Sequence, residues 1–403
     1  MASELNRWGT NTQLVRGGLR RSEFDETAEA IYLTSGYVYS SAEEAEAAFK
    51  GEHERYIYSR YGNPTVSVFE ERLRLLEGAE ACMATASGMA AVFAALASQV
   101  GAGDRVVASR ALFGSCHVIL TEILPRMGVE TVLIDGTSTE EWQRALAPGT
   151  NAVFLESPSN PGLEIIDLRA VCDLAHRVGA VVVVDNIFAS PVLQRPLDFG
   201  ADIVVYSATK HIDGQGRTLG GAVLGTADFI GNKLMPFLRH TGPSLSPFNA
   251  WVLLKGLETL TLRVNAMCDT ATALADELYG HDALREVRYP GHLSHPQHEL
   301  ALKQMRRGGT VLTFTVKGDG ANAKANAFRV MNAFEICDIS NNIGDAKSLI
   351  THPATTTHRR ISPEARAALG ITDGMIRLSV GLEDIDDLRR DVFQALSTVG
   401  RPV

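Results

Sequence analysis

Two hydroxyl groups and an amine lie close together in the sequence, directly after a short apolar run. Residues 203–206 are β-branched and aromatic, which is the pattern of a buried strand. Ser207, Thr209 and Lys210 follow this run. Because ligands of open α/β sheets bind at the carboxyl ends of the strands, these side chains lie where a ligand would be held. The lysine is either a solvated side chain or an amine, activated by partial burial and nearby positive charge, that bonds to a carbonyl cofactor.

A second apolar run ends in a carboxylate. Residues 181–184 are four valines, which predict a buried strand, and Asp185 closes it. An acid in this position is costly to bury unless a cation pairs with it. The protonated nitrogen of a pyridine ring is such a cation, and enzymes that use pyridoxal 5′-phosphate (PLP) pair an aspartate with it while a lysine holds the aldehyde. Lys210 and Asp185 together therefore favour a PLP site.

A glycine upstream suggests where a phosphate would bind. Gly88 lies where a predicted strand turns into a helix, so the backbone could approach a ligand closely. The amides of Gly88 and Met89 would open that helix, and helix N-termini bind anions. A plain tight turn is the alternative. With the hydroxyls of Ser87, Ser207 and Thr209 available to the same anion, we predict that these five residues hold the phosphate.

The elements that position these residues alternate in type along the chain. Between residues 65 and 206, short apolar runs predict strands, and stretches with helical periodicity lie between them. This alternation predicts an α/β fold with a mostly parallel sheet that is covered on both faces. Besides 203–206, the predicted strands are residues 105–108, 131–134, 152–155 and 181–184.

The motifs resemble those of the PLP-dependent enzymes of cysteine and methionine metabolism. The resemblance rests on V-D-N at 184–186 and S-A-T-K at 207–210, and it extends from Y-S-R-Y-G-N-P at 58–64 to R-L-S-V-G-L-E at 377–383. It implies the fold type I of PLP-dependent transferases, which is aspartate aminotransferase-like. This fold has a mostly parallel seven-stranded sheet and a smaller C-terminal α+β domain.

The resemblance also implies three parts of the chain. Residues 1–60 would form an N-terminal arm that contacts a neighbouring subunit, 61–261 the PLP-binding domain and 262–403 the C-terminal domain. Tyr58 and Arg60 would reach into the neighbour's site and bind the cofactor phosphate there. The guanidinium fork of arginine suits this task, since it is always charged and matches phosphate oxygens. A surface loop is the alternative for this tyrosine- and arginine-rich stretch.

Further roles follow from the same resemblance. Lys210 would hold the cofactor and act as the catalytic base, and Asp185 would pair with the ring nitrogen. Phe113 lies where relatives usually carry a tyrosine stacked on the ring, so stacking is kept but the phenol hydroxyl is lost. Asn160 would hydrogen-bond the ring hydroxyl of the cofactor, although Asn-Pro also marks ordinary turns.

A C-terminal arginine is the expected substrate contact. In the family, Arg377 would bind the α-carboxylate of the amino acid, with Ser348 beside it. The alternative is a structural ion pair between Arg377 and an internal acid, and Glu383 is near enough in sequence to be that partner.

The resemblance implies replacement at Cγ of an activated homoserine. The run N-I-G-D-A-K-S-L at 342–349, the residue Phe113 and the loop 211–217 resemble the sulfhydrylase branch more than the cystathionine branch. We therefore expect O-succinyl-L-homoserine and sulfide to give L-homocysteine and succinate in methionine biosynthesis. Cystathionine γ-synthase is the first alternative, followed by O-acetylhomoserine sulfhydrylase and methionine γ-lyase. A non-catalytic α/β protein that keeps a phosphate site is a further alternative.

Composition argues against other classes of protein. The 403 residues suit two domains, and the net charge of −9 without a basic block gives little support to nucleic-acid binding. Five scattered cysteines predict reduced thiols in a cytoplasm, and no run is long enough to span a bilayer. We expect a homo-oligomer, a tetramer built as a dimer of dimers, with small-molecule substrates.

Two other patterns in the sequence have simpler explanations than a binding site. His292, His295 and His298 invite a metal hypothesis, but Pro296 breaks their helical spacing and no carboxylate–cysteine set accompanies them, so no metal is predicted. The glycines at 214–220 have the spacing G-x-G-x-x-x-G and precede a strand-like run. The context of a dinucleotide-binding loop is therefore missing, and a loop beside the cofactor is expected.

Overall fold

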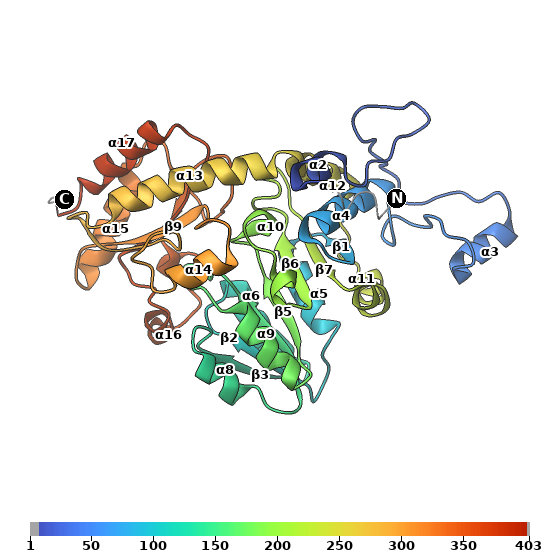
Figure 1. Cartoon of the computed structure of the whole chain (residues 1–403), viewed down its shortest axis with the longest axis horizontal. Helices are drawn as coiled ribbons and strands as arrows, with labels where there is room; N and C mark the ends of the chain where they lie inside the picture. Colours follow the sequence, from blue (N-terminus) through green and yellow to red (C-terminus); the bar gives the residue numbers. More distant parts are fainter. Residues whose placement is uncertain (1–7, 401–403) are drawn as a thin grey trace.

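The apolar runs of the first part form one sheet in the computed structural model, which describes residues 8–400 (Figure 1). The strand order is β1-β7-β6-β5-β4-β2-β3; β7 is antiparallel to both neighbours, and the other pairs are parallel. The mostly parallel seven-stranded sheet is thus confirmed. Its strands are β1 (Ala81–Thr85), β2 (Arg105–Ser109), β3 (Glu130–Ile134), β4 (Thr150–Glu156), β5 (Val181–Asp185), β6 (Ile203–Ser207) and β7 (Gly221–Gly225).

Helices cover both faces of this sheet, which is why its strands are apolar on both sides. Alternate residues of β5 show the two faces: Val182 and Val184 pack in one buried cluster with α9 (Leu168–Arg177), and Val183 packs in another with α5 (Gly88–Ala97). The other α-helices of this part are α4 (Pro64–Glu77), α6 (Gly114–Val118), α7 (Leu124–Arg126), α8 (Thr139–Ala145), α10 (Ser190–Leu193), α11 (Met235–Thr241) and α12 (Pro247–Glu258).

One long helix, α13 (Leu260–Leu278), joins the two parts of the molecule (Figure 1). Its first half, including Val264, belongs to the core of the first part, and its second half, including Leu274, belongs to the core of the second. Helix α12 ends at Glu258, and Thr259 separates it from α13. The predicted domain boundary at 261/262 therefore falls inside α13, and the division into three parts stays a prediction.

The second part is a smaller sheet with helices packed on it. Its strand order is β10-β11-β12-β9-β8; β10 and β11 are parallel, and the other pairs are antiparallel. The strands are β8 (Leu284–Arg288), β9 (Val311–Val316), β10 (Asp338–Ile339), β11 (Leu349–Thr351) and β12 (Met375–Ser379). The helices are α14 (His298–Gln304), α15 (Ala321–Ala333), α16 (Pro363–Ala368) and α17 (Ile385–Leu396). The expected smaller α+β domain is confirmed.

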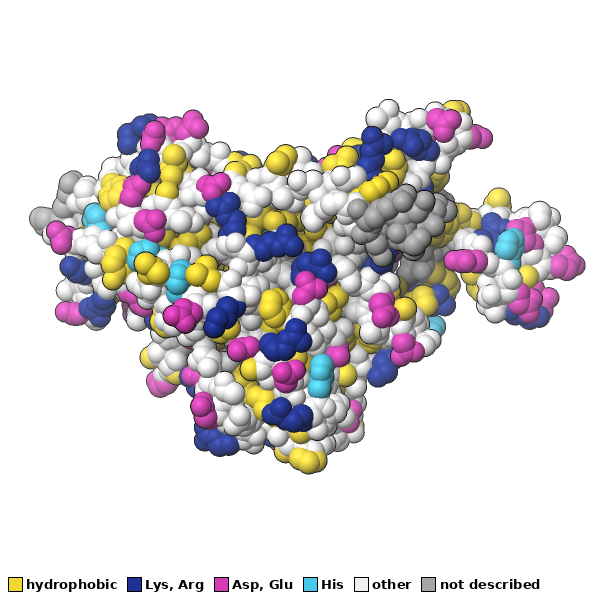
Figure 2. Space-filling model, in the orientation of Figure 1, with side chains coloured by type: hydrophobic (Ala, Val, Ile, Leu, Met, Phe, Trp, Pro, Cys, Tyr) yellow, Lys and Arg dark blue, Asp and Glu magenta, His cyan; other side chains and the backbone are white. Residues whose placement is uncertain are grey.

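The N-terminal segment is attached to the body only in part. Helix α2 (Thr10–Arg16) packs on it, and its Leu14 is buried in the first core. Helix α3 (Ala42–Lys50) stands away from the body, and the space-filling view shows it as a separate lobe (Figures 1 and 2). The side chains of Phe24, Leu33 and Val38 are 81%, 68% and 89% exposed, so this segment presents apolar surface. Of the predicted arm, residues 1–7 lie outside the described residues.

Candidate active site

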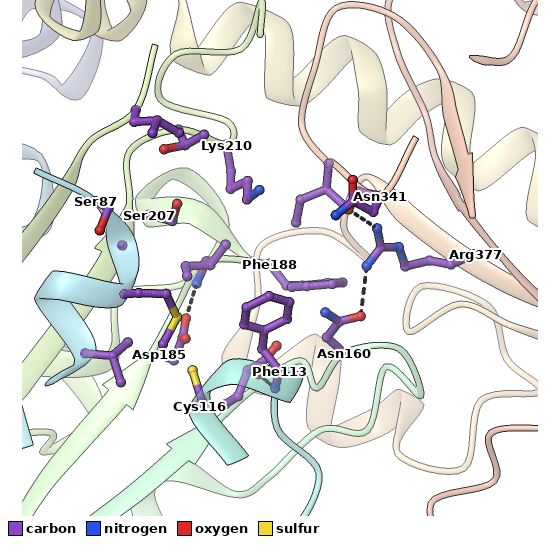
Figure 3. Close-up of a pocket in the computed structure, with 18 residues that line it drawn as sticks. Ser87, Phe113, Cys116, Asn160, Asp185, Phe188, Ser207, Lys210, Asn341 and Arg377 are labelled. Carbon is purple, nitrogen blue, oxygen red and sulfur yellow. Dashed lines mark hydrogen bonds between the residues drawn. The ribbon is translucent and has the colours of Figure 1, made fainter. Parts of the chain in front are cut away.

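A cavity of about 230 Å³ lies at the carboxyl ends of β4, β5 and β6, where the sequence placed its chemistry (Figure 3). The N-terminus of α5 closes one end of it, and residues of the second part close the other. Most of the predicted site residues line this cavity, namely Ser87, Gly88, Met89, Phe113, Asn160, Asp185, Ser207, Thr209, Lys210 and Arg377. Tyr58, Arg60 and Ser348 do not line it.

The end of the cavity at α5 has the shape of an anion cradle. Ser87 is the N-cap of α5, and its hydroxyl accepts a hydrogen bond from the Ala90 amide at 3.2 Å. A Cβ on Gly88 would lie 2.5 Å from Cβ of Ser207, so only glycine fits this approach of the helix to β6. Hydroxyls and the first amides of a ten-residue helix can therefore meet one anion.

Residues 8–400 of the same chain bring no basic side chain to this end. Within residues 8–400, the only basic residues that line the cavity are Lys210 and Arg377. In Figure 3, Arg377 lies on the side of the cavity opposite Ser87, and Lys210 lies above its middle. A phosphate at α5 would thus have hydroxyls and amides here, but a guanidinium partner would have to come from another chain.

The floor of the cavity carries two buried carboxyl groups. Asp185 is 1% exposed, and its Oδ1 accepts a hydrogen bond from the Ile187 amide at 3.1 Å. Burial raises the pKa of Asp185 to about 7, and no cationic side chain in the described part of the chain forms an ion pair with it. A cationic ring nitrogen at this position would pair with Asp185, so the residue fits PLP.

The second buried carboxyl group belongs to Glu156, which the sequence analysis missed. It ends β4 directly beside Asp185 on β5, and its Oε2 accepts a hydrogen bond from the Phe113 amide at 2.8 Å. Burial, and then the neighbouring Asp185, raises the pKa of Glu156 well above its ordinary value. The signal was available, since Glu156 closes an apolar run just as Asp185 does. Glu156 positions the backbone of Phe113, whose ring faces the cavity.

Lys210 is held in the interior by an asparagine. Its Nζ donates a hydrogen bond to Oδ1 of Asn342, another residue that the sequence analysis did not assign. Burial, and then the positive charge of Arg377, lowers the pKa of Lys210 to about 8. A larger fraction of neutral amine is what a nucleophile and base requires.

Arg377 is a buried cation whose hydrogen-bond partners are all neutral. It is 2% exposed, Nη1 donates to Oδ1 of Asn160 at 2.9 Å, and Nη2 donates to the Asn341 carbonyl at 2.8 Å. Its Nε is buried and has no hydrogen-bond partner within residues 8–400. Burial lowers the pKa of Arg377 to about 10. Such a guanidinium is suited to a carboxylate supplied by a ligand.

Glu383 is not the ion-pair partner of Arg377, because it is bound to another residue. Glu383 accepts hydrogen bonds from the hydroxyl and the amide of Ser348, at 2.8 and 2.7 Å. The Ser348 hydroxyl also accepts from the Gly381 amide. Ser348 therefore fixes the loop after β12, and its predicted contact with the substrate stays a prediction.

Tyr58 and Arg60 lie outside the cavity of their own chain. Tyr58 is 41% exposed, and Arg60 lies in a separate cavity, 4.9 Å from the ring centre of Tyr61. Arg60 also donates a hydrogen bond to the Arg239 carbonyl. This placement is compatible with a site shared between subunits, and the phosphate-binding role of both residues stays a prediction.

The remaining wall of the cavity is mostly apolar, and these residues carried no signal in the sequence. They are Val92, Cys116, Ile187, Phe188, Leu219 and Ile343. The three histidines of the metal hypothesis have other contacts; for example, His295 hydrogen-bonds the Leu163 carbonyl at 3.0 Å. Among residues 8–400, no group of three potential metal ligands comes together, and no helix has the length and apolarity needed to cross a membrane.

Comparison with known proteins agrees with this geometry. The family model described as Cys/Met metabolism PLP-dependent enzyme matches residues 11–397. An O-succinylhomoserine sulfhydrylase of Mycobacterium tuberculosis is 60% identical over 383 residues, covering 95% of this chain and 94% of that protein. The corresponding protein of Pseudomonas aeruginosa is 46% identical and covers 98% and 97%.

A solved structure extends the likeness to the cofactor. The crystal structure of a putative O-acetylhomoserine (thiol)-lyase from Campylobacter jejuni, with N′-pyridoxyl-lysine-5′-monophosphate, has a TM-score of 0.92 and 32% identity. The match covers 97% of this chain and 100% of that one. A lysine, an aspartate and an anion cradle in one cavity agree with this relationship. The chain therefore belongs to the Cys/Met metabolism family of PLP-dependent enzymes.

Proposed function

We propose that this enzyme is an O-succinylhomoserine sulfhydrylase, which converts O-succinyl-L-homoserine and sulfide to L-homocysteine and succinate in methionine biosynthesis. The observation that carries the proposal is one cavity that both Lys210 and Arg377 line, so that a base and a guanidinium can meet the same substrate. The two sulfhydrylases, at 60% and 46% identity over nearly the whole chain, support the choice of substrates.

The residues of the cavity can hold PLP in one orientation. Ser87, Ser207 and Thr209, with the first amides of α5, would bind its phosphate, and Asp185 would pair with the ring nitrogen. Phe113 would pack against the ring. When bound, PLP supplies an electron sink for negative charge that develops next to the amino group of the substrate.

Lys210 would carry out the proton transfers. It would accept a proton from Cα, give that proton up, and then accept one from Cβ of the substrate, so that the succinyl group can leave Cγ as succinate. Hydrosulfide then adds at Cγ, and protons are returned to the carbon atoms. The burial that lowers the pKa of Lys210 to about 8 brings it close to neutral pH, where one group can both accept and donate protons.

Arg377 would fix the substrate in the orientation that these transfers require. Its guanidinium binds the α-carboxylate, and Asn160, which accepts from Nη1, holds the guanidinium in place. The apolar side chains of Phe188 and Ile343 line the same cavity and reduce the access of water. Held in this way, Cα lies within reach of Lys210 throughout the reaction.

We also propose that the enzyme works as a homo-oligomer, a dimer of dimers, with shared sites in the cytoplasm. The described part of the same chain brings no basic side chain to the phosphate end of the cavity, and Arg60 lies on the projecting N-terminal segment. The exposed apolar side chains of Phe24, Leu33 and Val38 on this segment offer a surface for a second copy. The five cysteines are free thiols, which suits a reducing compartment.

The experiment that tests the function is a product assay with both acceptors. The purified protein, saturated with PLP, is given O-succinyl-L-homoserine with either sulfide or cysteine, and kcat/KM is measured for each. Sulfide needs only access to Cγ, whereas cysteine brings an ammonium and a carboxylate that must both be paired when desolvated. We expect sulfide to be used far better. Comparable values or a preference for cysteine would assign the protein to cystathionine γ-synthase.

A further inference from the structure

The proposed substrate carries a second carboxylate, at the end of its succinyl group, that needs a cation. The inference below rests on the proposed function, because it concerns how that ester is recognised. The cavity offers Lys210 and Arg377, but these are required for the cofactor and for the α-carboxylate. A desolvated carboxylate without a partner is costly, so a third basic group should lie close to the reacting atoms.

A second cavity, of about 470 Å³, adjoins the active site. Thr209 and Leu219 line both cavities. Asn342 lines the second one, and its side-chain oxygen accepts the hydrogen bond from Lys210. A substrate chain that begins near Lys210 can therefore extend into this second cavity. In the described part of the chain, Arg217 is the only basic residue that lines the second cavity.

The Arg217 side chain is fixed on one side and open on the other. Its Nε donates to Oδ1 of Asp213 at 2.9 Å, and its Nη2 donates to the Asp213 carbonyl at 2.9 Å. The Arg217 amide donates to Oδ2 of the same residue at 2.6 Å. Nη1 has no hydrogen-bond partner among residues 8–400. The side chain is 37% exposed, so a ligand can reach it.

The charges around Arg217 leave one positive charge uncompensated. Asp213 is fully buried and faces two guanidinium groups, those of Arg217 and Arg263. Arg263 is occupied, because it donates to the carbonyls of His211 and Gly256. One carboxylate therefore balances two cations. Another acid, Asp345, lies beside Gly216, and it has its own cation in Lys347 at 3.8 Å.

We propose that Arg217 binds the terminal carboxylate of the succinyl group and so selects the succinyl ester over the acetyl ester. The acetyl ester ends in a methyl group and gains nothing from this cation. The exposed side chain of Leu219 provides an apolar wall at the junction of the two cavities, beside which the two methylene groups of the succinyl chain can pass. The loop 211–217, which the sequence analysis placed beside the cofactor, thereby becomes a determinant of substrate choice.

The test compares the two esters in one set of variants. We would measure kcat/KM for O-succinyl- and O-acetyl-L-homoserine, from release of succinate or acetate, in the PLP-saturated wild type and in Arg217→Gln. Loss of one charge-assisted contact should lower kcat/KM for the succinyl ester by about 10- to 100-fold and change that for the acetyl ester by less than about two-fold. Arg217→Lys should keep part of the preference, because it keeps the charge.

Arg110→Gln is the matched control. Arg110 is 39% exposed and pairs with an aspartate, as Arg217 does, but it lines neither cavity. The proposal is overturned if kcat/KM falls equally for both esters in Arg217→Gln, or if the succinyl-to-acetyl ratio of kcat/KM does not change. It is also overturned if Arg110→Gln shows the same loss, or if the wild type has no preference between the esters. If Arg217→Gln does not fold, Arg217→Lys still decides by its ratio. If the wild type released succinate or acetate without forming homocysteine, the proposed function would be refuted. The ratio of kcat/KM for the two esters would still decide the role of Arg217.

Discussion

Replacing Asp185 with asparagine should stabilise the cofactor-free protein and at the same time remove most of its activity. Asp185 is a buried carboxyl group that forms no ion pair within residues 8–400, and Glu156 lies beside it. Asparagine keeps the shape and the acceptor for the Ile187 amide but removes the buried charge. The same charge is what would hold a cation at the ring nitrogen, so the two effects have opposite signs.

The size of the stabilisation follows from the pKa of Asp185, which burial raises from 3.8 to about 7. A folded-state pKa above the unfolded value means that stability is fully present below about pH 4 and is lost as the pH rises to about 7. Each pH unit of this interval is worth about 1.4 kcal/mol, so the charged group costs the fold at most roughly 4 kcal/mol. Above pH 7, Asp185→Asn should therefore be more stable than the wild type by up to this amount.

The assay is urea unfolding of the cofactor-free wild type and Asp185→Asn, at pH 4 and at pH 8. The difference in free energy of unfolding should be near zero at pH 4 and favour the variant at pH 8. Asp319→Asn is the control, because Asp319 is 96% exposed and should show neither effect. With PLP, Asp185→Asn should lose at least about 100-fold in kcat, as is usual when one preorganised electrostatic contact is removed. A variant that is less stable at pH 8, or that keeps full activity, would refute the reasoning.

Three further results are expected. Lys210→Ala should lose the visible absorbance band of the bound cofactor and about 10²–10⁴-fold in kcat; an unchanged spectrum and normal turnover would contradict the role of Lys210. Arg377→Ala should mainly raise KM, by about 10- to 100-fold, since a charge-assisted contact with the substrate is lost; an unchanged KM in a folded variant would show that the α-carboxylate binds elsewhere. Mixing inactive Arg60→Ala with inactive Lys210→Ala should restore some activity, because one mixed site would be intact; if reassembled hetero-oligomers stay inactive, the site is not shared.

The sequence was sufficient for the parts of the site that follow from strand ends. Apolar runs that end in polar residues placed Asp185, Ser207 and Lys210 at one edge of a sheet, and the structure brings them into one cavity. Glu156 carries the same signal on the neighbouring strand, since it also closes an apolar run.

Other contacts depend on tertiary structure and could not be read from spacing. Glu383 is six residues from Arg377, yet it bonds Ser348, since the turn at Gly381 brings the start of β11 beside it. Asn342 reaches Lys210 from a loop of the second part of the chain, 132 residues away in sequence. The positions of Tyr58 and Arg60 in the assembled enzyme depend on a second copy, so the structure of one chain leaves them as predictions.

The electrostatics of the cavity explain why these residues act as a set. Burial shifts the pKa of Asp185 and Glu156 upward and the pKa of Lys210 and Arg377 downward. Each shift favours the neutral form, because burial outweighs the attraction of the opposite charges that the chain provides. A ligand could match three of these groups at once. Its cationic ring nitrogen would pair with Asp185, its carbonyl would bond to Lys210, and its carboxylate would pair with Arg377. The fold thus places charges that are poorly compensated by the protein itself at the positions where cofactor and substrate would compensate them.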